Sequence, residues 1–332
     1  MSGGDMSGGG MSGARILPLL LLAGLAGCSE PLVHTTDAAP VPAGSPAAVA
    51  ASPRATDRFS TPEGELVVVP IEHATLLFLW QGRAIYVDPA SPAVDDATLP
   101  PADLVLVTSP RYDHLDPFAL SQVRKAGTVV VGPPAVDART RVDVVLREGD
   151  TRSLPPGIGV TAFPAYSLAR GPGPGLRYQV RGQGVGYVLE LGGLRVYVSG
   201  DTECTPEMKA LANVDVAFVS LNVPYAMTPG EANECVAAFR PKVVFPYAYR
   251  HAVPATLDRA ALGPGIEVRR RELYPRAGAF RARAYVAFTH GQWGYADDLL
   301  DAAKQRDPEG DADWRVQWTR QWLREYERPW PW

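Results

Sequence analysis

Two short segments of this 332-residue chain place residues able to bind metal or move protons directly after strand-like runs. Asp113 and His114 follow the apolar run 104–107, and Asp201 follows the run 194–199. Loops at strand ends are common positions for binding and catalytic residues. One imidazole and two carboxylates meet the three-ligand requirement of a single zinc or manganese ion. These three residues are therefore candidate metal ligands.

An arginine lies two positions before Asp113. Arg111 cannot lose its proton in a protein, so it cannot bind a metal ion. Its guanidinium can instead pair with carboxylates through parallel hydrogen bonds and neutralise them. The same residues thus support two alternatives, one divalent ion or a metal-free arginine–carboxylate network, and we prefer the second.

The segment 108–116, TSPRYDHLD, resembles the T-H-x-H-x-D-H box of metallo-β-lactamase-fold hydrolases. In that family the two leading histidines hold the first of two metal ions. Their positions are taken here by Ser109 and Arg111, whereas Asp113 and His114 are retained. The resemblance implies the fold, an αββα sandwich of the α/β class, and a damaged first metal site.

Three further segments resemble the same family. GDT at 200–202 matches the segment with the bridging aspartate, which implies that role for Asp201. The run YQVRGQGVGY resembles H-P-K-G-x-G-x-G-Y and puts Gln179 at the third histidine position. FPYAYR resembles the P-x-H-Y segment and puts Ala248 at the last one, although the nearby His251 is a possible substitute. On this mapping a two-metal site is not expected.

The likeness extends from about Leu66 to Pro275 and is strongest to the ascorbate-6-phosphate lactonase-like branch, with a looser likeness to N-acylphosphatidylethanolamine-hydrolysing phospholipase D. It implies that His73 and Asp88, in the opening segments EHATLL and AIYVDP, support the metal ligands. The fold alone does not name a substrate.

Two functions remain open. The preferred one is a non-catalytic protein of the cell envelope that uses Arg111 and Gln179 to bind a small polar or anionic ligand. The alternative is a mononuclear hydrolase of lactones, esters or phosphodiesters, with Asp201 as base and a metal-activated water. The net charge of −4, without a basic stripe, disfavours nucleic acid as a partner.

The N-terminal segment predicts a bacterial lipoprotein. Arg15 precedes a short apolar run, and LAGC at 25–28 resembles a lipobox, so residues 1–28 form the signal segment and Cys28 receives the lipid. Ser29 after the cysteine favours the outer membrane, with the protein facing the periplasm. Residues 29–61 have the Ala-, Pro- and Ser-rich composition of a disordered tether.

The remaining chain divides into a metallo-β-lactamase-like domain, 62–280, and a C-terminal extension, 281–332. Thr228, Pro229 and Glu231 predict a capped helix that ends near Phe239. The extension shows a strand-like run at 282–288 and then a helix with large aromatic residues every four positions, at Trp314, Trp318, Trp322 and Tyr326. That aromatic face predicts a docked helix, with a membrane-interface surface or a cover over the cleft as alternatives. Cys204 and Cys235 are candidates for a disulfide in an oxidising compartment.

Overall fold

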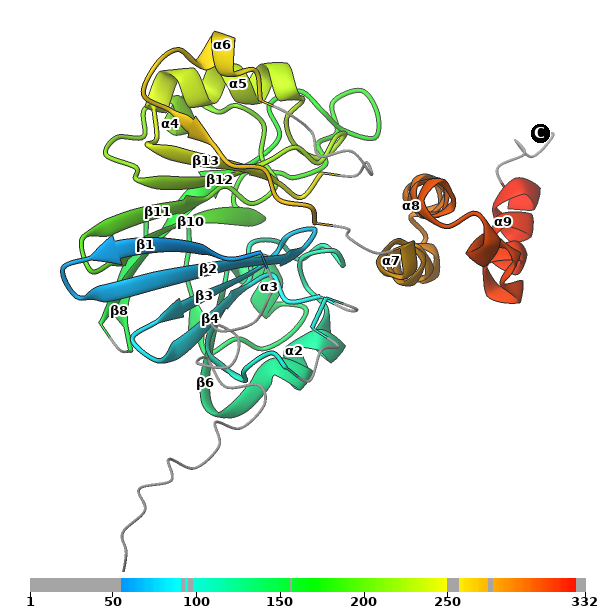
Figure 1. The fold of residues 1–332 in the computed structure, drawn as a ribbon, viewed down its shortest axis with the longest axis horizontal. Helices are drawn as coiled ribbons and strands as arrows, with labels where there is room; N and C mark the ends of the chain where they lie inside the picture. The colour runs from blue at the N-terminus through cyan, green and yellow to red at the C-terminus, as the bar shows by residue number, and fades with distance from the viewer. Residues whose placement is uncertain are drawn as a thin grey trace, which may run out of the picture. The chain divides into compact units, whose positions relative to one another are not determined.

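The computed structural model describes residues 55–90, 93–94, 98–155, 157–249, 257–273 and 277–326. Two seven-stranded sheets stack face to face (Figure 1), and apolar residues of both sheets fill one core between them. Phe78 of the first sheet meets Phe218 of the second edge to face, with ring centroids 5.6 Å apart. The α/β sandwich predicted from the sequence is confirmed.

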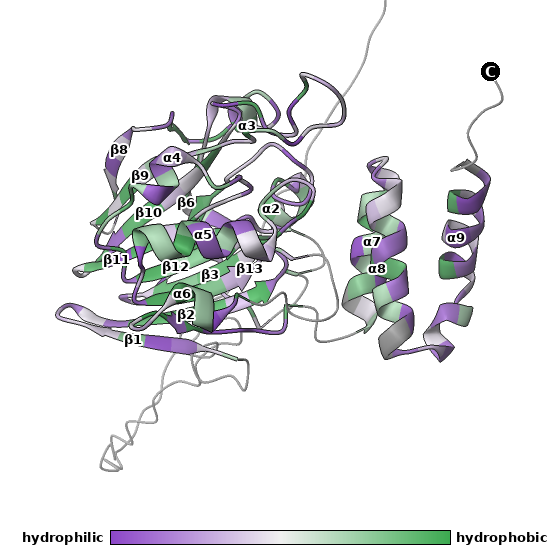
Figure 2. Cartoon of the chain, turned by 90° about the horizontal axis from the view of Figure 1, so that it is seen from above, coloured by the Kyte–Doolittle hydropathy of each residue, from purple (hydrophilic) through white to green (hydrophobic). Residues whose placement is uncertain are grey.

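The first sheet follows the order of the chain. Its strands are β1 (Asp57–Thr61), β2 (Gly64–Glu72), β3 (Thr75–Trp80), β4 (Arg83–Val87), β5 (Ala102–Leu106), β6 (Arg124–Gly132) and β7 (Val144–Val145). Pairing is antiparallel from β1 to β4 and parallel from β4 to β7. In Figure 2 the edge strand β1 is hydrophilic and the inner strands are hydrophobic, a pattern that protects an open edge from further pairing.

The second sheet repeats this plan. Its strands are β8 (Thr151–Leu154), β9 (Ile158–Ala165), β10 (Gly184–Leu191), β11 (Leu194–Val198), β12 (Val216–Ser220), β13 (Val243–Tyr247) and β14 (Glu267–Val268). Pairing is antiparallel from β8 to β11 and parallel from β11 to β14. The loops after β4, β5, β11, β12 and β13 therefore all leave from carboxyl ends of parallel strands, where ligand sites form in such sheets.

Short helices cover the outer faces of the sandwich. They are α2 (Pro117–Val123), α3 (Pro134–Asp137), α4 (Pro206–Lys209), α5 (Pro229–Phe239) and α6 (Arg259–Leu262). Residues of α2 and α3 join a second apolar cluster on the outer face of the first sheet. Ala232, Cys235, Val236 and Phe239 of α5 are buried, and α5 and α6 lie outside the second sheet (Figure 1). The predicted helix start is confirmed, because Thr228 caps α5 and forms a capping box with Glu231.

From residue 277 to residue 326 the described chain forms helices and the turns that connect them. They are α7 (Ala277–Thr289), α8 (Trp293–Arg306), the 3-10 turn η1 (Glu309–Ala312) and α9 (Trp314–Tyr326). The strand predicted at 282–288 is wrong, since these residues belong to α7. The alternation of arginine with apolar residues imitates a strand, but the buried Phe280, Ala284 and Ala287 follow helical spacing. The aromatic-rich helix is confirmed as α9.

The domain boundaries shift by a few residues. β1 begins at Asp57, inside the segment expected to be tether, and α7 runs across the expected boundary at 280 and 281. Cys28, the signal segment and the tether up to residue 54 lie outside the described residues. Among the helices that are described, none combines the length and apolar character needed to cross a bilayer.

A disulfide joins Cys204 to Cys235 of α5, with Cα atoms 5.6 Å apart. The disulfide connects the loop after Asp201 to α5, the helix that lies outside the second sheet. We predict that reduction lowers the free energy of unfolding by roughly 3 to 4 kcal/mol, as expected for a loop of this size. Denaturant titration with and without dithiothreitol measures this. The double variant Cys204→Ser/Cys235→Ser should have the same free energy of unfolding as the reduced protein, with or without dithiothreitol. A change in its stability on adding dithiothreitol would contradict the assignment.

Candidate functional site

The candidate ligands converge at the carboxyl ends of the parallel strands. Asp113 and His114 lie in the loop between β5 and α2, and Asp201 lies in the loop after β11. All three are buried, and one ligand atom from each lies within 4.8 Å of the others. Within the described part of the chain, these residues form a triad that could hold one metal ion.

Arg111 lies against this triad. Its Nη2 is 2.8 Å from Asp113 Oδ2 and its Nε is 3.2 Å from Asp113 Oδ1, which makes a two-point contact. Its Nη1 is 3.3 Å from Asp201 Oδ2. The guanidinium also lies over the ring of Tyr225, with Cζ 3.3 Å from the centroid. One cation therefore joins both carboxylates and is held in place by an aromatic face.

His114 has both ring nitrogens next to carboxylates. Nδ1 is 2.7 Å from Asp88 Oδ2, and Nε2 is 3.2 Å from Asp201 Oδ2. Burial by itself would lower the pKa of His114, but Asp201, Asp88 and Asp113 raise this pKa well above its usual value. The imidazole is therefore a second cation of the cluster at neutral pH.

The two carboxylates respond in the opposite direction. Burial alone would raise the pKa of Asp113, but Arg111 and His114 hold that pKa well below its usual value. Burial opposes ionisation of Asp201 as well, and His114 and Arg111 lower the pKa of this carboxyl. Both groups are negatively charged in the folded protein, which is the form that pairs with Arg111.

Neighbouring side chains fix the orientation of Asp201. Ser220 Oγ donates to Oδ1 at 2.8 Å, and Asn222 Nδ2 donates to Oδ2 at 2.9 Å. Gln179 Nε2 donates to the backbone carbonyls of Asp201 at 2.6 Å and Ala165 at 2.9 Å. The amide of Gln179 thus holds the backbone beneath the site, and its Nε2 is engaged with protein carbonyls.

His73 and Asp88 lie behind the triad. His73 Nε2 is 3.5 Å from Asp113 Oδ2, and burial lowers the pKa of His73 to about 4, so the ring is neutral. Asp88 accepts hydrogen bonds from Thr108 N at 2.7 Å and Thr108 Oγ1 at 2.6 Å. Burial raises the pKa of Asp88, whereas His114 and these donors oppose that rise. Both residues orient the groups in front of them.

The other positions named by the family resemblance provide no metal ligand here. Ser109 is buried and its Oγ accepts the Arg111 backbone N–H at 3.4 Å. Ala248 is buried at a positive φ of 53° and offers only a methyl group. His251 lies outside the described residues, so the substitution considered for position 248 stays a prediction.

Several residues of the site gave no sequence signal of their role. Tyr225, which stacks on Arg111, lies three residues before Thr228, the capping residue of α5. Ser220 ends β12 and Asn222 follows it, so a polar pair after a buried strand is the signal that could have found them. Arg283 of α7 is fully buried, 3.9 Å from Glu72, although it belongs to the C-terminal extension.

The turn between α7 and α8 reaches the same region. His290 stacks on Tyr112, with centroids 5.1 Å apart. Tyr225 Oη donates to Gln292 Oε1 at 3.4 Å, and Tyr295 Oη lies 3.5 Å from His73 Nδ1. Because these contacts involve neighbours of Arg111 and Asp113, the C-terminal helices take part in enclosing the site.

The part of the chain that resembles known proteins contains the candidate ligands Asp113, His114 and Asp201. The family model described as the beta-lactamase superfamily domain matches residues 68–248. A UPF0173 metal-dependent hydrolase of Thermus thermophilus is 29% identical over 172 residues, which cover 48% of this chain and 71% of the relative. A UPF0173 metal-dependent hydrolase of Enterococcus faecalis is 28% identical over 152 residues, 44% of this chain and 67% of the relative.

Solved structures give the same result. A candidate metal-dependent hydrolase from Parabacteroides distasonis is 37% identical and superposes with a TM-score of 0.62, covering 66% of this chain and 99% of that one. A metallo hydrolase from Ignicoccus hospitalis is 21% identical with a TM-score of 0.50 and covers 62% of this chain and 95% of that one. The second likeness concerns the fold alone.

The raised pKa of His114 makes a testable contribution to stability. Because the folded-state pKa lies above the unfolded value, the stabilisation is complete below the unfolded pKa and is lost as the pH rises through the folded pKa. We predict that His114→Gln destabilises the protein most at pH 6 and progressively less at alkaline pH. Denaturant unfolding of both proteins across this range measures the difference. A gap that widened with pH would show that the imidazole is neutral in the folded state.

Proposed function

This chain belongs to the beta-lactamase superfamily, and we propose that in this member the guanidinium of Arg111 takes the place of the metal cation. The observation that carries the proposal is its contact with both Asp113 and Asp201, two of the three candidate ligands. A guanidinium that pairs with two carboxylates supplies the positive charge those groups need.

A metal ion needs about three ligand side chains that are free to bind it. The family's first metal site has no ligand set here, because Ser109, Arg111 and Gln179 stand where the resemblance places its three histidines. The second site offers one imidazole and two carboxylates, but Arg111 already donates hydrogen bonds to Asp113 and forms an ion pair with Asp201. The residues therefore do not fit a resident ion while Arg111 holds this position.

The charge balance supports the same proposal. The carboxylates of Asp113 and Asp201 face two cations, Arg111 and protonated His114, whereas burial raises the pKa of Asp88 and disfavours its charged form. Without Arg111 the negative charges of Asp113 and Asp201 would face His114 as the one remaining cation of this group in a buried site. Desolvated charges of one sign are costly, so the arginine removes the need for a metal cation.

The proposed function is a non-catalytic, hydrolase-like module of the bacterial envelope. The side chains of Asp113 and Asp201 are fully buried, and that of Arg111 is 14% exposed. A small polar or anionic ligand would therefore meet the edge of the guanidinium, and the carboxylates are shielded from substrate. The lipobox-like LAGC supports anchoring through Cys28 to membrane lipid, in the outer membrane and facing the periplasm.

A second candidate is a hydrolase of lactones, esters or phosphodiesters that holds one zinc or manganese ion. The spacing of Asp113, His114 and Asp201 favours it, as do the printed names of the relatives, which are metal-dependent hydrolases. It requires Arg111 to leave both carboxylates. The two candidates therefore differ in one property, the affinity of the triad for metal when Arg111 is present.

We predict that the full chain, purified without chelator and offered zinc or manganese, binds no metal above background, whereas Arg111→Ala binds about one equivalent. Arg111→Ala should also lose roughly 3 to 5 kcal/mol of stability without metal, since two buried carboxylates lose their cation. Plasma mass spectrometry and denaturant titration with and without zinc measure both effects.

Arg111→Lys is the matched control, because lysine keeps the charge and should remain metal-free. Asp201→Ala in the Arg111→Ala background should abolish the gained site. One equivalent of metal on the wild-type protein, lost on Asp201→Ala, would reject the arginine-replacement proposal in favour of the mononuclear hydrolase. Metal-free Arg111→Ala would reject the idea that Arg111 stands in for an ion.

A further inference from the structure

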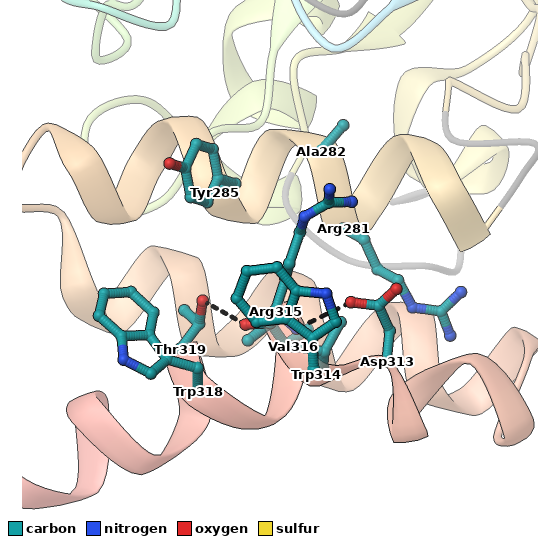
Figure 3. Close-up of a pocket in the computed structure, with 10 residues that line it drawn as sticks. Arg281, Ala282, Tyr285, Asp313, Trp314, Arg315, Val316, Trp318 and Thr319 are labelled. Atoms are coloured by element: carbon teal, nitrogen blue, oxygen red, sulfur yellow. Dashed lines mark hydrogen bonds between the residues drawn. The ribbon is translucent and has the colours of Figure 1, made fainter.

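A half-open cavity of about 700 Å³ lies among α7, α8 and α9, in the C-terminal helices. Figure 3 shows Trp314 and Trp318 projecting from α9 and Tyr285 from α7 around it. Leu300 and Val316 also line it, so its walls are mainly apolar. A lined apolar cavity on a helical layer outside the sandwich core is a candidate binding surface.

The aromatic side chains at this cavity are unusually exposed. Trp314 is 69% exposed, Tyr285 54% and Trp318 50%. Below them, Phe288 contacts Trp318 edge to face at 5.6 Å and Trp322 at 4.8 Å. The exposed ring of Trp318 is thus supported by the packed ring of Phe288. Soluble proteins rarely expose clustered apolar side chains, so such a cluster indicates an interaction site.

Positive charge accompanies these rings. The Arg315 guanidinium lies over the Trp314 ring, 5.3 Å from its centroid, and within the described chain it has no carboxylate at ion-pair distance. By contrast, Arg320 on the same helix is bound by Asp297, Asp301 and Asp311. Of the other charged residues that line the cavity, Arg281 is ion-paired with Asp307 at 2.7 Å. The Asp313 carboxylate accepts the Arg315 backbone N–H at 2.8 Å.

We infer that this aromatic–arginine surface, defined by Tyr285, Trp314, Arg315 and Trp318, binds the surface of a phospholipid bilayer. Tryptophan and tyrosine have apolar rings with one polar end, which suits the boundary between acyl chains and headgroups. An arginine beside them has the charge to attract lipid phosphates. The combination of exposed rings that have one polar end with a guanidinium beside them matches a bilayer surface in chemistry and charge.

The sequence adds an independent argument for this partner. The predicted lipid anchor, Cys28, precedes the first strand, which begins at Asp57, by 29 residues (57 − 28). An anchored domain would therefore meet its own bilayer at high effective concentration, so a weak surface is sufficient. The inference does not depend on Arg111 or on metal.

The test uses the unlipidated chain from Ser29 onward, which keeps every described residue and excludes the anchor. It is sedimented with vesicles of phosphatidylcholine alone and with phosphatidylglycerol added. We expect Trp314→Ala/Trp318→Ala to weaken binding about tenfold or more, from the apolar area lost. Arg315→Gln should weaken binding to the phosphatidylglycerol vesicles and leave phosphatidylcholine binding unchanged.

The matched control is Phe118→Ala on α2, an aromatic side chain that is 64% exposed on a different element and should bind as wild type. Tyr285→Ser provides a second test should the double variant fail to fold, as judged by circular dichroism. Absence of vesicle binding by the wild type, or equal binding by the double variant, overturns the inference. Concentration-dependent dimerisation that the double variant abolishes would assign the surface to a second copy and also overturn it.

Discussion

The contact of one guanidinium with two buried carboxylates is the interaction on which the site depends. Asp113 and Asp201 come from different sheets, and in a low-dielectric interior two such charges repel strongly. Arg111 converts this repulsion into an attraction across the two sheets. Tyr225 covers the guanidinium of Arg111, so solvent screens its ion pairs with the two carboxylates only weakly. The aromatic ring also holds the guanidinium in place from the face it covers.

The sandwich makes this contact possible by bringing parallel strands from two sheets to one edge. Asp88 and Asp113 follow strands of the first sheet, and Asp201 and Ser220 lie at strand ends of the second. The backbone turns sharply where it enters the site, with positive φ at His73, Asp88 and Ala248. Such turns cost conformational energy, and here they bring Thr108 N and Ala248 N to the acceptors Asp88 and His73.

Membership of the family does not by itself fix the chemistry of this site. The relatives are named as metal-dependent hydrolases, and the scaffold is shared with them. Whether the same scaffold holds an ion depends on a few side chains at the strand ends, because the fold positions ligands but does not supply them. A cation fixed to the chain provides the charge of a metal without its open coordination position, and that position is where metal hydrolases activate water.

The sequence by itself determined the α/β sandwich, the capped helix α5 and the aromatic-rich helix α9, because each has a local pattern of periodicity and capping. The sequence also identified Asp113, His114 and Asp201 as candidate ligands, because each lies in a short contiguous motif that can be read directly from the sequence. The sequence also suggested that Arg111 pairs with carboxylates, but only the tertiary structure decided the distances at which it reaches both, that Tyr225 covers it, and that residues 282–288 are helical. These depend on contacts between segments far apart in the chain, and on burial, which local periodicity does not encode.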